Sequence, residues 1–217
     1  MNHTLEIDSV QLEFGGIKIL SDIYLQCKTG NITALLGRNG SGKSCLMQII
    51  YGTLKTEKSV RIDKLPYCEA FKHKGLLNYL PQFNFIPASL SLKRVFSDFE
   101  IDFSIFVKKF PEFSAKHNSS VGKLSGGERR LVEFYVIVKT PSYFALLDEP
   151  FTHLNPLQIE RVKVLLEEEK QNTGILLTDH MFRQVIAICD NLYILANGKT
   201  HLSKTISDIE TLGYAKL

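Results

Sequence analysis

The residues best suited to chemistry form the run "GRNGSGKS" at positions 37–44, which fits the pattern G-x-x-x-x-G-K-[ST]. It lies between an apolar stretch typical of a buried strand and a stretch typical of a helix. Glycines let backbone N–H groups turn toward phosphate oxygens, and a helix N-terminus adds partial positive charge. Lys43 would reach the β- and γ-phosphates, and Ser44 would offer its hydroxyl to Mg²⁺. The alternative is a glycine turn that happens to precede a lysine.

Two carboxylates end a second apolar run, "YFALLDEP", at positions 143–150. Asp148 would hold Mg²⁺ through its water shell, and Glu149 would orient or deprotonate a water that attacks the terminal phosphate. The alternative is a pair of acidic turn residues, with Glu149 merely solvated.

A third run, "KLSGGERR" at positions 123–130, places Gly126 and Gly127 at the start of a helix predicted from Ser125 to about Thr140. Taken alone, these glycines could simply end a loop. Together the three runs resemble the Walker A, signature and Walker B motifs of an ABC-type ATPase, and the resemblance covers essentially the whole chain.

The resemblance implies ATP and Mg²⁺ as cofactors, ATP hydrolysis as the activity, and two subunits packed head to tail. Ser125 and the backbone of Gly126 and Gly127 would cap the γ-phosphate of ATP held by Lys43 of the other subunit. That other subunit would be a second copy or a paralogous ATPase, and transmembrane permease subunits would be further partners. The implied location is the cytoplasmic face of the cell membrane.

The site residues implied in this way fall into three sets. The nucleotide contacts are Phe14, Gly37, Arg38, Asn39, Gly40, Ser41, Gly42, Lys43, Ser44, Cys45, Ser125, Gly126 and Gly127. The catalytic residues are Glu149, His180 and Gln82, and the Mg²⁺ ligands are Ser44, Gln82 and Asp148.

Gln82, His180 and Phe14 stand apart from the three runs quoted above, and each has an ordinary alternative. Gln82 in "YLPQF" matches the Q-loop but could be a turn residue beside Pro81. His180 in "LLTDH" matches the switch histidine but could be a cap or surface residue. Phe14 matches the aromatic residue that stacks on adenine but could belong to the core.

The chain departs from the family at the D-loop, where "THLN" at positions 152–155 stands in place of S-A-L-D. His153 replaces a small residue, and Asn155 keeps the capping ability of aspartate but loses its charge. This departure leaves communication across the subunit interface open. Cys45 replaces a common hydroxyl residue and Glu128 a frequent glutamine, which we expect to be mild changes.

The elements that must position these residues alternate along the chain. Strands are expected at 5–14, 17–28, 31–37, 143–149 and 174–178, helices at 44–52 and 156–171 with Asn155 as N-cap, and a hairpin at 192–202 turning at Asn197 and Gly198. The pattern predicts an α/β fold, a P-loop NTPase core with a mainly parallel sheet, an N-terminal antiparallel β part and a small inserted α-helical subdomain. The predicted core lobe is 1–82 with 141–217, and the predicted helical subdomain is 83–140, ending in the signature helix.

Phenylalanines concentrate in the helical insertion, whose helices are expected within 89–100 and 102–113. We expect a groove, formed with the Q-loop, for a short helix of the transmembrane subunit. The alternative, that about half of these rings are lobe core, follows from the usual burial of large apolar residues. The residues concerned are Phe83, Phe85, Phe96, Phe99, Phe103 and Phe106.

Composition limits the remaining choices. The 217 residues suit a single domain, and a net charge of +3 is too small to imply a nucleic-acid partner. Four cysteines without CxxC spacing suggest neither a zinc site nor a disulfide framework. No apolar run approaches the roughly 20 residues that span a bilayer, and no leader peptide is seen, so we expect a cytosolic chain.

The first functional hypothesis is therefore the ATPase subunit of a membrane transporter. A soluble ABC ATPase of DNA repair or ribosome work is a second, although neither a long coiled coil nor a second cassette is present. A P-loop kinase is a third, against which the signature run argues. Positions 178–199 are similar to ATPases of lipopolysaccharide export and of branched-chain amino-acid import, which leaves cargo and direction open.

Overall fold

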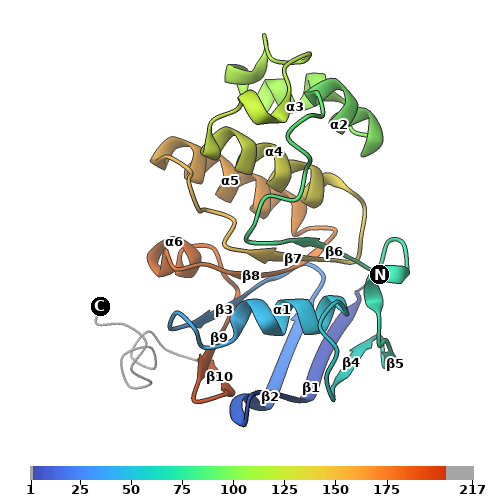
Figure 1. Cartoon of the computed structure of the whole chain (residues 1–217), viewed down its shortest axis with the longest axis vertical. Helices are drawn as coiled ribbons and strands as arrows, with labels where there is room; N and C mark the ends of the chain where they lie inside the picture. Colours follow the sequence, from blue (N-terminus) through green and yellow to red (C-terminus); the bar gives the residue numbers. More distant parts are fainter. Residues whose placement is uncertain (1, 204–217) are drawn as a thin grey trace.

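A ten-stranded mixed sheet runs through the protein, with the strand order β5-β4-β1-β2-β10-β9-β3-β8-β7-β6 (Figure 1). The computed structural model describes residues 2–203, so Met1 and positions 204–217 of the predicted core lobe lie outside the described residues. The strands are β1 (Thr4–Phe14), β2 (Ile17–Lys28), β3 (Ile32–Gly37), β4 (Ser59–Ile62), β5 (Leu65–Pro66), β6 (Leu77–Leu80), β7 (Phe144–Asp148), β8 (Gly174–Thr178), β9 (Asn191–Ala196) and β10 (Lys199–Ser203). The helices are α1 (Lys43–Tyr51), α2 (Leu92–Asp98), α3 (Phe103–Lys109), α4 (Gly126–Lys139), α5 (Pro156–Glu169) and α6 (Phe182–Ile186), and short 3₁₀ turns occur at Ala70–Lys72, Pro111–Phe113 and Val121–Lys123.

The strands β9, β3, β8, β7 and β6 are parallel and form the centre of the molecule. Every residue of β3, β7 and β8 is buried, because helices cover both faces of this part of the sheet. Along β7, Ala145 and Leu147 pack into a cluster with α4 and α5, whereas Phe144 and Leu146 pack into a second cluster with α1. Figure 1 shows α4 and α5 on one side of these strands and α1 on the other. The predicted α/β fold class is confirmed.

The N-terminal part is antiparallel, since β1 pairs with β2 and β4, and β4 pairs with β5. It joins the parallel part at one seam, where β10 pairs with β2 through Lys199 and Asp22. The Thr200 hydroxyl reinforces the seam by accepting from the Tyr24 N–H and donating to the Tyr24 carbonyl. The predicted hairpin is confirmed, and its turn residues Asn197 and Gly198 both have positive φ, as a primed turn requires.

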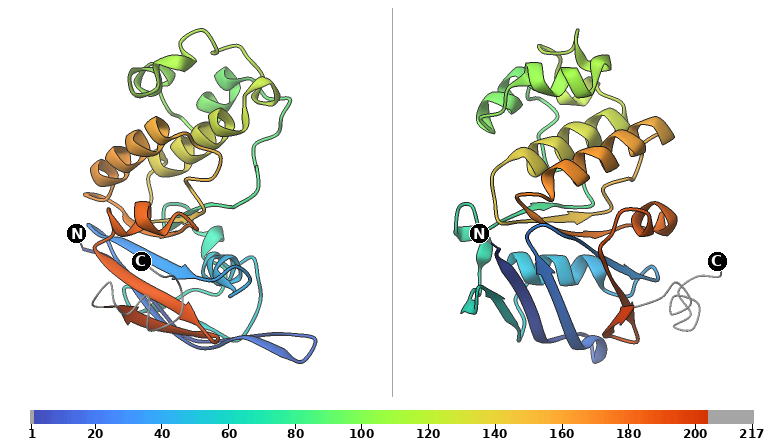
Figure 2. Two further views of the ribbon diagram at one scale, coloured as in Figure 1. Left: turned by 90° about the vertical axis from the view of Figure 1, so that its left-hand side faces the viewer. Right: turned by 180° about the vertical axis from the view of Figure 1, so that it is seen from behind.

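The helices α2 and α3 lie beyond α4 and α5 at one end of the molecule (Figure 2). The centre of this helical part is aromatic, with Phe96, Phe106, Phe110, Phe113 and Tyr135 buried among one another. The expected groove is therefore wrong for Phe96 and Phe106, as the alternative of partial core burial allowed. Phe96 and Phe106 are core residues, and three more pack partly buried against the same core: Phe85, Phe99 and Phe103. Only Phe83 of the six is largely accessible, with 66% of its surface exposed.

No helix within residues 2–203 has both the length and the apolar character needed to cross a bilayer.

Candidate functional site

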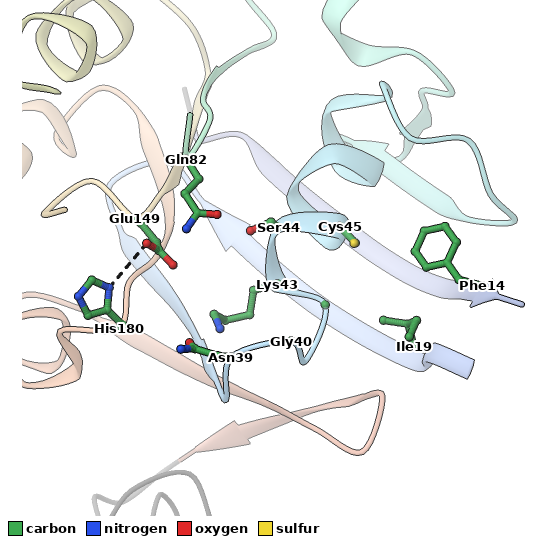
Figure 3. Close-up of a pocket in the computed structure, with 11 residues that line it drawn as sticks. Phe14, Ile19, Asn39, Gly40, Lys43, Ser44, Cys45, Gln82, Glu149 and His180 are labelled. Atoms are coloured by element: carbon green, nitrogen blue, oxygen red, sulfur yellow. Dashed lines mark ion pairs between the residues drawn. The ribbon is translucent and has the colours of Figure 1, made fainter. Parts of the chain in front are cut away.

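A cleft of about 590 Å³ opens at the carboxyl ends of the parallel strands (Figure 3). This is the edge at which open α/β sheets bind ligands, since the loops that follow the strands converge there. The cleft is lined by Phe14, Ile19, Asn39, Gly40, Gly42, Lys43, Ser44, Cys45, Gln82, Glu149 and His180. Ten of these eleven residues were predicted, and Ile19 was not. The structure thus gathers residues from five separate segments of the sequence.

The loop between β3 and α1 has the backbone of an anion cradle. Gly42 has φ 100° and precedes the first residue of α1, and no side chain caps this helix start. The first N–H groups of α1 therefore have no intrahelical partner and are available to an anion. A Cβ at Gly42 would lie 2.9 Å from Ile19, so both the conformation and the space require glycine here. These features fit a phosphate group.

Lys43 is almost completely buried at the bottom of this loop. Its Nζ donates to the carbonyls of Gly37 at 2.7 Å and Arg38 at 3.2 Å. Burial lowers the pKa of Lys43, and the nearby carboxylates of Glu149 and Asp148 oppose that effect. A cation so placed, beside open helix N–H groups, suits an anionic ligand.

Asp148 ends β7 and is only 1% exposed. Its Oδ2 accepts from the Tyr79 hydroxyl at 3.3 Å, whereas its Oδ1 has no hydrogen-bond partner among the described residues. Burial raises the pKa of both Asp148 and Tyr79. An unpaired buried carboxylate oxygen is costly unless something binds it, and a cation fits.

The chemistry of these donors suits Mg²⁺, which is held by one or two carboxylates together with water and phosphate oxygens. Ser44 lines the cleft near Asp148 and offers a hydroxyl oxygen. Within residues 2–203 there is no cluster of three His, Cys, Asp or Glu side chains that would favour an all-protein metal cage.

Glu149 has φ 53°, a left-handed conformation that costs a non-glycine residue about 1–2 kcal/mol. Its N–H donates to the Thr178 carbonyl at 2.7 Å, and its Oε2 accepts from the Thr152 hydroxyl at 3.1 Å. The His180 Nδ1 lies 3.6 Å from the same Oε2, and Gln82 points into the cleft beside them (Figure 3). The three predicted catalytic side chains therefore share one side of the cleft.

Asp179 supports this side of the cleft and was missed from the sequence. It is fully buried, accepts from the N–H groups of Phe151 and Met181 at 2.9 Å each, and lies 3.5 Å from the His180 Nδ1. Burial raises its pKa. Asp179 directly follows a buried strand, in "LLTDH", and this position could have indicated from the sequence that it belongs to the site.

Arg130 was also missed, because a charged residue on a predicted helix is expected to face solvent. It lies on α4, is 2% exposed, and donates to the carbonyls of Pro81 at 2.7 Å, Asp148 at 2.5 Å and Glu149 at 3.0 Å. Nothing in the sequence pattern distinguishes it from the neighbouring Arg129.

The run that opens α4 does not line the cleft of its own chain. Ser125 caps α4, because its Oγ accepts from the Glu128 N–H at 3.3 Å while the Glu128 Oε2 accepts from the Ser125 N–H at 3.0 Å. A Cβ on Gly127 would lie 2.5 Å from the His153 carbonyl oxygen, whereas one on Gly126 would make only ordinary contact with the His153 ring. The D-loop therefore packs on the signature run of the same chain.

Asn155 caps α5 as predicted, in a second reciprocal box with Gln158. The Asn155 Oδ1 accepts from the Gln158 N–H at 3.0 Å, and the Gln158 Oε1 accepts from the Asn155 N–H at 3.1 Å. His153, two residues earlier, has φ 66°.

Comparison with known proteins places this arrangement among its relatives. The family model described as "ABC transporter" matches residues 20–152. The lipopolysaccharide export system ATP-binding protein LptB of Escherichia coli K12 is 30% identical over 212 residues, covering 90% of this chain and 88% of LptB. The ribose import ATP-binding protein RbsA of Hahella chejuensis is 26% identical, with 96% of this chain matching 46% of that protein. A solved structure described as the ATP-binding subunit of an ABC transporter superposes with a TM-score of 0.81 at 22% identity, covering 95% of this chain and 92% of the other, and it supports the fold.

Proposed function

The chain belongs to the ABC transporter family as an ATP-binding subunit, and from this premise we propose that it hydrolyses ATP to drive separate transmembrane permease subunits. The observation that carries the proposal is the convergence of four features on one cleft. These are the uncapped start of α1, the buried Lys43, the unpaired Oδ1 of Asp148 and the strained Glu149.

In this proposal the phosphates of ATP lie against the N–H groups between Gly40 and Cys45, and Lys43 neutralises the terminal phosphates. Mg²⁺, when bound, neutralises charge on the β- and γ-phosphates, and Ser44, Asp148 and Gln82 would hold it directly or through water. The remaining nucleotide contacts would come from Gly37, Arg38, Asn39, Ser41, Gly42 and the ring of Phe14.

Glu149 accepts a proton from, or orients, the attacking water in this proposal. Its carboxylate is suited to the role because Thr152 and the left-handed backbone fix its direction. His180, held near Asp179, would contact the terminal phosphate, and Gln82 would line up the water from the other side.

The test of this function is Glu149→Gln. We expect kcat for ATP hydrolysis to fall about 10²–10⁴-fold, because the base is lost, while ATP affinity in the presence of Mg²⁺ stays within about twofold. Glu160→Gln, an exposed glutamate of α5 paired with Lys163, is the control and should hydrolyse ATP at the parent rate. Parent-like turnover by Glu149→Gln contradicts the role of Glu149.

The proposed working form is a head-to-tail pair, formed with a second copy or a paralogous ATPase subunit, on the cytoplasmic face of the membrane. The position of Ser125, Gly126 and Gly127 outside their own cleft supports it, since a partner's ATP could approach them once Ser125 gives up its bond to Glu128. We also keep the division into a core lobe, 1–82 with 141–217, and a helical subdomain, 83–140, as a proposal.

Ser125→Arg tests the pair. We expect this variant to bind ATP like the parent but to lose ATP-dependent dimerisation, because the longer side chain would occupy the place of the partner's phosphate. Size-exclusion chromatography with light scattering, in the Glu149→Gln background that slows turnover, measures the outcome. Unchanged dimerisation would remove the proposed role of the signature run.

A further inference from the structure

Arg130 occupies an unusual electrostatic position for a buried cation. Among residues 2–203 it forms no ion pair, and its hydrogen bonds go to three backbone carbonyls, those of Pro81, Asp148 and Glu149. The two terminal nitrogens of the planar guanidinium make these three bonds, which fix its orientation, whereas the buried Nε has no hydrogen-bond partner among the described residues. Arg130 therefore connects α4 to two other segments of the chain inside the protein.

The three carbonyls belong to the segments that carry the proposed catalytic groups. The Pro81 carbonyl belongs to the peptide bond that leads into Gln82. The Glu149 carbonyl belongs to the residue that is proposed to activate water. One guanidinium therefore restrains the backbone from which both of these side chains project.

Glu149 depends on such restraint because its left-handed backbone is not self-supporting. The Thr178 carbonyl holds the N–H of Glu149, and Arg130 holds its carbonyl. Thr152 completes the arrangement through the carboxylate itself. The Glu149 carbonyl also accepts from the Thr152 N–H at 3.3 Å, so removing the bond from Arg130 would leave this carbonyl with only the longer of its two bonds.

Arg130 also lies on α4, five positions after the N-cap Ser125, or about 7 Å along the helix axis. A small shift of α4 along its axis would therefore move the guanidinium against the carbonyls of Asp148 and Glu149. We infer that Arg130 is a positioning residue that makes the orientation of Glu149 and Gln82 depend on the placement of the signature helix. The inference rests on the proposed ATPase function.

Arg129 provides a matched control one residue away on the same helix. Its guanidinium also bonds a backbone carbonyl, that of Ile86 at 2.5 Å, and pairs with the buried Glu133, but it touches neither Glu149 nor Gln82. The pair Arg130→Lys and Arg129→Lys thus makes the same chemical change at two carbonyl-bonded sites. Lysine keeps the charge but lacks the planar set of donors, so it cannot hold three carbonyls at once.

The kinetic experiment measures kcat, KM and thermal midpoint for both variants. We expect Arg130→Lys to lower kcat about tenfold or more with KM for ATP within about twofold, because a displaced base slows the chemical step without weakening phosphate binding. Arg129→Lys should keep kcat within about twofold of the parent. Equal loss of kcat in both variants, or no loss in Arg130→Lys, overturns the inference.

A double variant asks whether Arg130 acts through Glu149. In the Glu149→Gln background, Arg130→Lys should lower the residual rate by a smaller factor than in the parent, since one of the two groups that it positions is gone. A loss as large as in the parent would show that Arg130 does not act through Glu149 and would contradict the inference.

Hydrogen exchange supplies a readout that does not depend on activity. In the full chain without nucleotide, the amides of Glu149 and Thr152 should exchange about tenfold faster in Arg130→Lys than in the parent, and at the parent rate in Arg129→Lys. Unchanged exchange at both amides in Arg130→Lys overturns the inference even if the parent protein proves to hydrolyse no ATP. An inactive parent by itself would instead overturn the proposed function.

If Arg130→Lys does not give folded protein, Arg130→Gln and Arg129→Gln replace the pair. Glutamine can donate to a carbonyl without introducing a charge, so the buried carbonyls keep a partner. The same difference between positions 130 and 129 is expected in kcat and in exchange, and equality between them overturns the inference.

Discussion

The starts of α1 and α4 both follow glycine-rich runs, yet they are built differently. The start of α1 follows Gly42, carries no side-chain cap and opens on the cleft. The start of α4 is closed by the reciprocal bonds of Ser125 and Glu128 and lies outside the cleft. Because a cap uses the same N–H groups that would bind an anion, glycine-rich sequence alone does not identify a phosphate site. The α1 start is ready for a ligand, whereas Ser125 would have to exchange its bond to Glu128 for a ligand contact.

The largest effect is expected at the uncapped end. Lys43→Ala removes a buried cation at the anion cradle and should weaken ATP binding about 10- to 100-fold, the range for hydrogen bonds to charged groups. Lys58→Ala is the matched control, since the Lys58 Nζ also donates to a backbone carbonyl, that of Ile49 at 2.5 Å, but lies outside the cleft. Equilibrium titration with a fluorescent ATP analogue and Mg²⁺ measures both. Equal ATP affinities for the two variants would mean that Lys43 contributes no more to ATP binding than a lysine outside the cleft.

An intermediate effect is expected where the capped end packs on the D-loop. Gly127→Ala should destabilise the nucleotide-free protein by about 1–3 kcal/mol, because its Cβ would meet the His153 carbonyl oxygen at 2.5 Å. Gly126→Ala is the control and should shift the free energy of unfolding by less than about 1 kcal/mol, since its nearest contact would be 3.7 Å and alanine favours helix. Urea denaturation compares them. If both variants unfold at the same urea concentration, the monomer tolerates a Cβ at position 127 and glycine is not required there for packing.

The smallest effect is expected for the cap itself. Burial raises the pKa of Glu128, but its bonds from Lys116 and the Ser125 N–H outweigh burial and leave the pKa below its usual range. A depressed carboxylate pKa stabilises the fold above the unfolded pKa of about 4.3, and that contribution is lost as pH falls through the folded value. Glu128→Gln keeps a capping side chain and loses only the charge, so it should cost less than about 1 kcal/mol at pH 7.

The difference in the free energy of unfolding between the parent and Glu128→Gln should shrink to zero at acidic pH. Thermal unfolding between pH 3 and pH 7 measures it. Glu167→Gln, which breaks an exposed pair with Lys170 on α5, should show a smaller difference throughout. If the difference in the free energy of unfolding between the parent and Glu128→Gln grew on acidification, it would contradict a lowered pKa of Glu128 in the folded protein.

Features set by neighbouring residues could be predicted from the sequence. Asn155 and Pro156 start α5, Gly52 ends α1, and Asn197 and Gly198 turn the last hairpin, because each depends on the conformational preferences of adjacent residues. The resemblance to the ABC-type ATPases, and not local pattern, implied that the P-loop, Glu149 and Gln82 serve one nucleotide, and the structure brings them to one cleft.

Features set by distant residues could not be predicted in the same way. The apolar periodicity of 89–113 did not separate core phenylalanines from accessible ones, because that depends on how α2 and α3 meet α4. Arg130 bonds to carbonyls 18 to 49 residues away, and Asp179 accepts from the N–H of Phe151, 28 residues away. The helix α6 is too short to give a periodic signal. Composition also gave no indication that Gly127 faces the D-loop carbonyl.

The seam between β2 and β10 has a mechanical consequence. Phe14 and Ile19 belong to the antiparallel part, on one side of the Lys199–Asp22 pair, whereas the loop that holds Lys43 belongs to the parallel part on the other. The two parts already share one apolar cluster, to which β1, β2, β3 and α1 all contribute. A molecule long enough to touch Phe14 and Lys43 together would add a second connection between them, at the surface of the cleft.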